Sequence, residues 1–366
     1  MQSAVRLSQH GPALLLLLAL ISSTAAAAAG DRADDTGQRD DGEGNALSPD
    51  DTLFAHLRCF ERFASTQRSD RESDASDWLE TSENYTRKTD RSPNFLKCVL
   101  TKLQLYDPQR VEFNTNILMQ QYQRYGLWMN LSQQSLQAIV NTTGRIVLAD
   151  ASSEAIYAAF ESIFRDHSHS YFQLFLRDPI VLGRIYQNKS WNGKKPNQTV
   201  IEFCEMHMSE GLWKEICLLR NYQISNRTAA MADHIDCVFK EFRYITVAGL
   251  IDESEILRDF RLVFALTEDT KTHVHRCVEE SSSEGAIRQR SLRMYRCLLS
   301  GADTSRSFKE AFDFREVRSG NLSYILRDLQ YDRDQVRAEI LTLDRERCDD
   351  QQRSISRAQK STTPHQ

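Results

Sequence analysis

Asp313 and Glu316 are the residues whose type and spacing most clearly indicate a binding site, in this case for a cation. They lie in the stretch SFKEAFDFREVRS, from Ser307 to Ser319, where three phenylalanines are interleaved with charged residues. On a helix, acids three residues apart face one side, so both carboxylates can converge on one point. Phe308 and Phe312 would add an apolar wall, and such a pocket suits a small organic cation.

A solvated helix surface is the second interpretation of this stretch. Asp313 and Glu316 could instead form ion pairs with Arg315, Arg318 or Lys309, because mixed charge runs are usually exposed. Taken alone, the motif favours this interpretation, so the rest of the chain has to decide between the two.

Residues 1–29 have the pattern of a secretory signal peptide. Arg6 precedes an apolar run from Pro12 to Ile21, and a small-residue tract from Ser22 to Ala29 follows. No later stretch is apolar over the length that a membrane span requires. We therefore expect a soluble, secreted protein that does not bind in a membrane.

Secretion makes disulfides the first expectation for the eight cysteines. No pair has the short CxxC spacing of a zinc ribbon, and His167 with His169 lacks further ligands, so we expect no metal and no cofactor. Seven sequons would place their asparagines on accessible surface if glycosylated; these are Asn84, Asn130, Asn141, Asn188, Asn197, Asn226 and Asn321.

The expected organisation is a disordered acidic leader at 30–47, helical domains at 48–195 and 196–348, and a polar tail at 349–366. Ser48 is a helix cap, Pro49 takes the first helical position, and apolar residues at helical spacing follow. Strand-like alternation is almost absent, which predicts an all-α protein. The other expected helices are Phe95–Leu105, Val111–Arg124, Ser132–Val140, Glu154–Phe164, Ser170–Phe175, Val200–Met208, Glu210–Leu219, Thr228–Tyr244, Ser254–Leu266, Thr270–Glu279, Ala286–Leu299, Ser305–Phe314 and Arg333–Leu343.

Charge and cysteine distribution narrow the class of protein further. The net charge of −5 is mild, and basic residues alternate with acids, which argues against a nucleic-acid partner. The first domain holds only Cys59 and Cys98, whereas the second holds six cysteines. A small helical domain with three disulfides can keep a hollow interior, which favours a ligand container.

Six stretches, in order along the chain, resemble the long-form D-seven salivary proteins of mosquitoes and related blood-feeding flies. That family consists of two-domain relatives of insect odorant-binding proteins. The resemblance implies two tandem odorant-binding-protein-like helical domains stapled by disulfides. The stretches are SPDDTLFAHLRCFER, KCVLTKLQLYDPQRVEF, IEFCEMHMSEGLWKEICLLRNY, DHIDCVFKEFRYIT, SLRMYRCLL and FKEAFDFREVRS.

The resemblance implies a monomeric scavenger in saliva that binds small host mediators and has no catalytic activity. In the family, the C-terminal domain binds biogenic amines such as serotonin, noradrenaline and histamine. The N-terminal domain of several members binds cysteinyl leukotrienes or a thromboxane analogue, and some members bind adenine nucleotides. By this resemblance the protein opposes haemostasis and inflammation during blood feeding.

The family's amine pocket maps onto six residues of this chain. Asp313 and Glu316 would take the ammonium, and the others would bind ring hydroxyls or an imidazole and wall the ligand. These others are Arg220, Tyr222, His234 and Tyr295. Phe314 departs from the family, which often has tyrosine there. Other interpretations remain open, because Arg220 could merely complement a helix dipole and His234 could lie on the surface.

The same resemblance implies the disulfide pairs Cys59–Cys98, Cys204–Cys237, Cys217–Cys348 and Cys277–Cys297. Family members usually carry a further pair in the first domain, and both of its cysteines are missing here. Asn94 occupies one position, and the other falls near Ser152–Ile156. The loss makes a lipid site in this domain less secure. Tyr125, Trp128 and Phe160 could line an apolar channel, although aromatic residues at helical spacing more often form core.

Two other classes of binding protein stay open. The fold would also permit an odorant or pheromone carrier, although two acids argue against a neutral volatile ligand. An inhibitor that binds a host coagulation factor through its surface is the other alternative. An enzyme is not expected, because the chain has no serine elbow, phosphate loop or HExxH motif.

Overall fold

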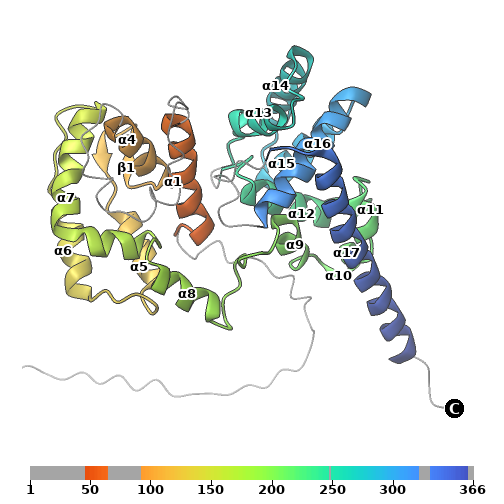
Figure 1. Cartoon of the computed structure of the whole chain (residues 1–366), viewed down its shortest axis with the longest axis horizontal. Helices are drawn as coiled ribbons and strands as arrows, with labels where there is room; N and C mark the ends of the chain where they lie inside the picture. Colours follow the sequence, from red (N-terminus) through yellow and green to blue (C-terminus); the bar gives the residue numbers. More distant parts are fainter. Residues whose placement is uncertain (1–45, 65–91, 247–248, 321–329, 362–366) are drawn as a thin grey trace, which may run out of the picture. The chain divides into compact units, whose positions relative to one another are not determined.

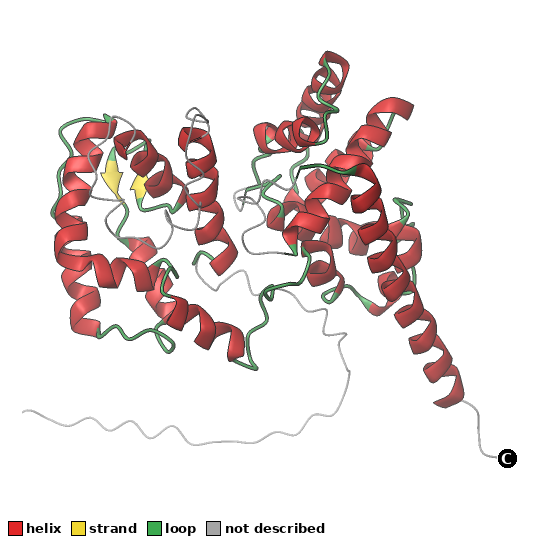
Figure 2. Ribbon diagram, in the orientation of Figure 1, coloured by secondary structure: helices red, strands yellow, loops and turns green. Residues whose placement is uncertain are grey.

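The computed structural model of this chain describes residues 46–64, 92–246, 249–320 and 330–361. Helices make up most of these residues, and the strands among them form one two-stranded sheet (Figure 2), which confirms the all-α class. No helix in the described ranges has the length and apolar character needed to cross a bilayer. The expected signal peptide, most of the acidic leader, and the sequons at Asn84 and Asn321 lie outside the described residues.

The N-terminal half begins as its capping residues predict. The Ser48 hydroxyl accepts a hydrogen bond from the Asp51 N–H at 3.1 Å, and the Ser48 N–H donates to the Asp51 carboxylate at 2.9 Å. Leu47, which we placed in the disordered leader, is instead buried in the apolar cluster of this half, and its N–H donates to Gln121 Oε1 at 2.6 Å. The elements of this half are α1 (Pro49–Ala64), α4 (Ser92–Lys102), β1 (Tyr106–Asp107), β2 (Glu112–Phe113), α5 (Asn116–Tyr125), α6 (Gln133–Gly144), α7 (Ser153–Leu174) and α8 (Pro179–Gln187) (Figure 1).

Two helix predictions in this half were wrong in detail. The helix expected from Val111 begins only at Asn116, because the Asp107 carboxylate caps a turn after β1 and the chain returns as β2. Val111 itself has a φ of 57°, which a helix interior excludes. The helices expected at Glu154–Phe164 and Ser170–Phe175 form the single helix α7, which is kinked at His167.

A hydrogen bond joins the two regions of the N-terminal half in which, by the resemblance, family members carry the disulfide that this chain lacks. Ser153 Oγ donates to Asn94 Oδ1 at 2.6 Å, which links the start of α7 to α4. One turn of α4 further on, the Cys59–Cys98 disulfide joins this helix to α1. Helix α4 is therefore tied to one neighbour covalently and to the other by a polar contact.

The C-terminal half contains nine helices among its described residues and three disulfides, Cys204–Cys237, Cys217–Cys348 and Cys277–Cys297. All four disulfides of the chain join the pairs that the resemblance implies. The helices are α9 (Val200–Glu205), α10 (Glu210–Trp213), α11 (Ile216–Arg220), α12 (Thr228–Glu241), α13 (Glu253–Leu262), α14 (Glu268–Ser282), α15 (Ile287–Leu298), α16 (Ala302–Ser319) and α17 (Arg333–Ser361).

The predicted end of the last helix was wrong. We ended the last helix at Leu343 and treated 349–366 as a polar tail, but α17 continues to Ser361 (Figure 1). The segment contains Arg, Gln, Lys and Ala, which favour helix, and neither Gly nor Pro until Pro364. A polar composition therefore does not mark the end of this helix.

Buried apolar side chains form two separate clusters, one from Leu47 to Ile185 and one from Val200 to Ile340. Helix α16 contributes Phe308, Phe312 and Phe314 to the second cluster. The rings of Phe308 and Phe312 pack 5.2 Å apart, and Phe312 also meets Phe242 at 5.2 Å. The apolar face of α16 thus fixes the helix that carries the two expected acids.

Candidate functional site

A pocket in the C-terminal half is lined by all six residues of the expected amine site. The space not occupied by protein atoms in and around it is about 480 Å³, and this figure includes open solvent at its mouth. Its polar lining consists of Asp313, Glu316, Arg220, Tyr222, His234 and Tyr295, together with Glu205 and Asp344. Its apolar wall consists of Ile201, Leu219, Met231, Ile235, Val238, Phe312 and Ile340.

The two acids of α16 do not pair with the arginines beside them in the sequence. Arg315 is fully buried and binds Glu255 at 2.8 Å, while Arg318 binds Asp259 at 2.7 Å; both acids belong to α13. These ion pairs anchor α16 on the side away from the pocket. The solvated-surface interpretation of this stretch is therefore wrong, because the helix is buried on both faces.

Asp313 accepts a hydrogen bond from a hydroxyl and forms no ion pair within the described part of the chain, although the Arg220 charge acts on it from a distance. Tyr222 Oη donates to its Oδ1, and no Lys or Arg of the described residues forms an ion pair with it. Tyr222 reaches this position from a left-handed backbone with a φ of 60°, directly after α11. Burial raises the pKa of Asp313 to about 7, although the Tyr222 hydrogen bond opposes the shift.

Glu316 is already paired with a cation. Its Oε1 accepts from Arg220 Nη1 at 2.7 Å and from Thr199 Oγ1 at 3.2 Å. Burial raises its pKa to about 7 even so, because the Arg220 charge is opposed by the neighbouring Glu205 and Asp313 carboxylates. The pocket lining thus contains four carboxyl groups and one guanidinium, that of Arg220.

Arg220 and His234 retain unused hydrogen-bonding atoms in the pocket. Arg220 Nε binds Glu205 at 2.5 Å, whereas its buried Nη2 finds no acceptor within the described part of the chain. His234 Nδ1 is likewise buried without a partner there. Burial, followed by the Arg220 charge, lowers the pKa of His234 to about 3, so its imidazole is neutral at physiological pH.

The aromatic residues complete the wall beside Asp313. Tyr295 is 3% exposed, and its ring centroid lies 6.1 Å from that of Phe312. Tyr222 approaches the same Phe312 ring at 6.1 Å with its edge. Burial raises the pKa values of both tyrosines, so both keep their hydroxyl protons and can donate hydrogen bonds.

Sequence reasoning missed two acids of the pocket. Glu205 ends α9, next to the disulfide-bonded Cys204, and it lines the pocket together with Ile201 of the same helix. Asp344 lies on α17, one residue beyond the point where we ended that helix, and its Oδ1 is 3.5 Å from Arg220 Nη1. Burial raises the pKa of both carboxyls.

The three aromatic residues expected to line a lipid channel lie in the core of the N-terminal half. Tyr125 and Phe160 are each 2% exposed, and Trp128 is partly buried against the same cluster. Tyr125 packs on Trp128 with ring centroids 6.2 Å apart, whereas Phe160 packs on Tyr171 at 5.2 Å. The core interpretation, which sequence reasoning left open, accounts for these contacts.

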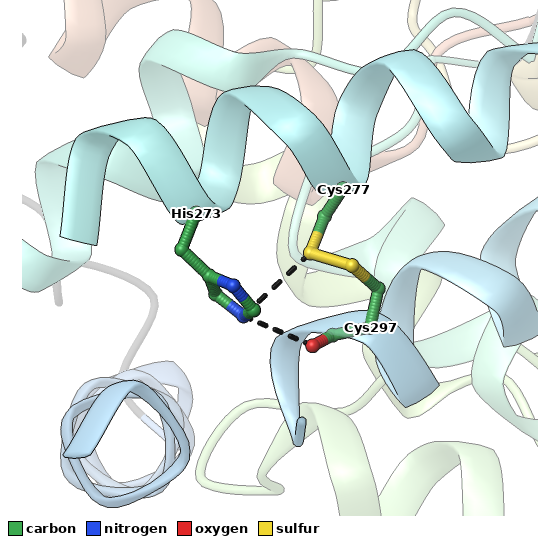
Figure 3. Close-up of side chains that lie close together, drawn as sticks. All are labelled: His273, Cys277 and Cys297. Carbon is green, nitrogen blue, oxygen red and sulfur yellow. Dashed lines mark hydrogen bonds between the residues drawn. A yellow bond between two sulfur atoms is a disulfide. The ribbon is translucent and has the colours of Figure 1, made fainter. Parts of the chain in front are cut away.

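A further cluster of possible metal ligands contains His273, Cys277 and Cys297 (Figure 3). The two cysteines form a disulfide with each other, so neither sulfur is a thiolate that could bind a metal ion. His273 Nε2 lies 3.0 Å from the Cys297 carbonyl oxygen and 3.7 Å from the Cys277 sulfur. These contacts assign the histidine to the packing around the disulfide.

Comparison with known proteins identifies the family. No protein-family model matches the chain. Long form salivary protein D7L3 of Anopheles gambiae is 51% identical over 310 residues, which cover 84% of this chain and 87% of the relative. The solved structure of the AeD7–leukotriene E4 complex shares the fold, with a TM-score of 0.67 at 24% identity; the match covers 79% of this chain and 96% of that one. The AnSt-D7L1–U46619 complex also shares it, with a TM-score of 0.65 at 25% identity; the match covers 82% of this chain and 97% of that one. The chain therefore belongs to the long-form D7 salivary proteins, which are secreted into saliva.

Proposed function

We propose that this protein scavenges biogenic amines in the pocket of its C-terminal half and thereby removes them from the host's haemostatic and inflammatory responses. The observation that carries the proposal is Asp313, a largely buried carboxylate that faces an apolar wall and has no cationic partner among the described residues. An ammonium group supplies the missing cation, and an aromatic ring on the same ligand fills the space beside Phe312.

The other end of the pocket suits a ligand that carries a polar ring substituent. Arg220 Nη2 can donate a hydrogen bond to a ring hydroxyl, and the neutral His234 can accept or donate one through Nδ1. Because both atoms are buried, leaving them unpaired costs free energy that the ligand recovers. Hydroxylated aromatic amines such as serotonin and noradrenaline meet all of these requirements, and histamine meets them with its imidazole.

Isothermal titration of the oxidised, full-length protein with serotonin, noradrenaline and histamine tests this function. We expect saturable binding with one site per chain for at least one amine. The control ligand is 5-hydroxyindole, which keeps the ring hydroxyl and lacks the ammonium, and we expect it to bind at least about 100-fold more weakly. Equal affinity for 5-hydroxyindole and serotonin would refute the role of Asp313.

We further propose that the protein acts by binding alone and performs no reaction on the amine. Its relatives are named as salivary proteins, and the residues that line the pocket include no Ser, Thr, Cys or Lys side chain. After incubation with the protein and extraction, the amine should be recovered with unchanged mass. A product that forms in proportion to protein concentration would contradict this proposal.

An eicosanoid is the second ligand class that we propose, on a narrower basis. The AnSt-D7L1 structure at 25% identity is a complex with U46619. U46619 is therefore the probe to titrate next, with saturable heat as the supporting result. Retained U46619 binding in a serotonin-saturated protein would assign it to a second site, and competition would assign it to the amine pocket.

A further inference from the structure

Arg347 of helix α17 contacts two glutamates of α9, Glu202 and Glu205. Arg347 Nη2 donates to Glu202 Oε1 at 2.9 Å, and its Nε lies 3.2 Å from Glu205 Oε2. The two acids occupy one side of α9, and the guanidinium spans them with a hydrogen bond to Glu202 and an ion pair to Glu205, whose Oε2 accepts no hydrogen bond from the described residues. Arg347 is 22% exposed, so the contact is shielded from much of the solvent.

Glu205 transmits this contact into the pocket. While its Oε2 faces Arg347, its Oε1 binds Arg220 Nε at 2.5 Å. Arg220 then reaches Glu316 at 2.7 Å and Asp344 at 3.5 Å with Nη1. The Arg220 side chain is 4% exposed and is held at both ends of its guanidinium, which keeps it on Glu316 and off Asp313.

One disulfide positions both ends of this series of contacts. Cys217 and Arg220 are one turn apart in α11, and Cys348 directly follows Arg347 in α17. The Cys217–Cys348 bond therefore fixes the turn of α17 that carries Arg347 against the helix that carries Arg220. Gln351, one turn further along α17, reaches back to the carbonyl oxygen of Lys214.

We propose that Arg347 is a positioning residue of the amine pocket: by fixing Glu205 it holds Arg220 on Glu316 and leaves Asp313 free to bind the ligand's ammonium. This inference rests on the proposed amine function. Without Arg347, Glu205 loses its second cation and Arg220 gains the freedom to swing toward Asp313, where it occupies the place of the ammonium.

A role of Arg347 through charge alone predicts the opposite result. Arg347 is a cation near a site for cations, so its removal should by itself strengthen amine binding. The positioning role predicts that Arg347→Ala binds serotonin about tenfold more weakly, because the return of Arg220 to Glu316 then costs part of the binding free energy. Whether Arg347→Ala strengthens or weakens amine binding therefore distinguishes the charge role from the positioning role.

The experiment measures serotonin affinity in Arg347→Ala, Arg347→Lys and the control Arg345→Ala. Arg345 is exposed on the same helix and has no ion pair among the described contacts, so its removal changes the charge alone. We expect wild-type affinity for Arg345→Ala and partial rescue by Arg347→Lys, because an ammonium lacks the fork that spans both acids. Equal or tighter binding by Arg347→Ala overturns the proposal. If that variant does not fold, Arg347→Lys compared with Arg345→Lys decides by the same criterion.

A second readout needs no ligand. In protein with ¹⁵N-labelled arginine, hydrogen exchange of the Arg220 Nε–H reports its bond to Glu205. The positioning role predicts at least about tenfold faster exchange in Arg347→Ala than in Arg345→Ala, and unchanged exchange overturns it. Wild-type protein that binds no amine contradicts the proposed function instead, and the exchange rates then still decide whether Arg347 positions Arg220.

Discussion

Arg220 Nη1 lies 2.7 Å from Glu316 Oε1, so one of the two expected ammonium ligands is already bound to a cation. Asp313, one turn earlier on α16, accepts a hydrogen bond from the Tyr222 hydroxyl and forms no ion pair with any described residue. The two acids therefore have different roles in our proposal. Asp313 binds the ammonium directly, and Glu316 holds the arginine that meets the other end of the ligand.

Amine affinity should rise with pH between about 6 and 8. Burial raises the pKa values of Asp313 and Glu316 to about 7, and only the ionised carboxylates attract an ammonium. Below pH 7 protons compete with the amine, so serotonin should bind about tenfold more weakly at pH 6 than at pH 8 for each acid that must ionise. Titrations in buffers of different ionisation enthalpy should show proton release near pH 7. A flat pH profile over this range would contradict the assignment.

Tyr222→Phe should move that pH profile upward. The Tyr222 hydroxyl lowers the pKa of Asp313 by donating to its carboxylate, so its loss leaves the acid protonated to a higher pH. Phenylalanine keeps the ring beside Phe312 and should leave the fold intact. Serotonin affinity measured from pH 6 to 9 should show a higher midpoint than wild type. Tyr295→Phe is the matched control, since it removes the other pocket tyrosine hydroxyl, and its midpoint should move less.

Asn94→Cys/Ser153→Cys should form a fifth disulfide. The two side chains already meet at 2.6 Å, at the positions where the family resemblance places the missing pair. Closing this loop should stabilise the folded protein by about 2–4 kcal/mol, measured by denaturant unfolding of the oxidised double variant beside the oxidised wild-type protein. Peptide mapping without reduction identifies the bond. Free thiols at residues 94 and 153 after oxidation would show that the backbones are not placed for it.

Arg315→Ala should destabilise the C-terminal half by about 3–5 kcal/mol, because it leaves Glu255 and Asp259 short of a cation in a buried site. Lys309→Ala is the control, since Lys309 lies on the same helix and forms no ion pair in the described part of the chain. Thermal unfolding followed by circular dichroism measures both variants. Similar midpoints for the two would show that the buried ion pairs do not anchor α16.

The sequence predicted which residues line the pocket better than how they pair with one another. Helical spacing placed Asp313 and Glu316 on one face, and family motifs supplied the other four polar residues, because each is identified by its local neighbours. No local pattern shows that Arg220 turns to Glu316, since this depends on how α11 packs against α16. Glu205 was missed because the acids of a short helix are usually exposed.

Helix ends were predicted less well than helix interiors, for physical reasons that differ between positions. At Val111 a turn capped by Asp107 overrode an acceptable helical pattern. On α17 the polar residues after Leu343 continue a helix whose inner side, with Asp344 and Arg347, contacts the pocket and α9. In the first case a local cap ended the helical pattern, and in the second helix-favouring residues without Gly or Pro continued it.

The most direct measurement of the central claim is serotonin binding to Asp313→Asn beside Asp303→Asn. Asparagine keeps the shape of the side chain and its hydrogen bond with Tyr222 while it removes the charge. Asp303 is exposed on the same helix and serves as the control. We predict that Asp313→Asn loses at least about 100-fold in affinity and all of its pH dependence from this group, whereas Asp303→Asn binds as wild type does. Wild-type affinity in a folded Asp313→Asn protein would contradict the account.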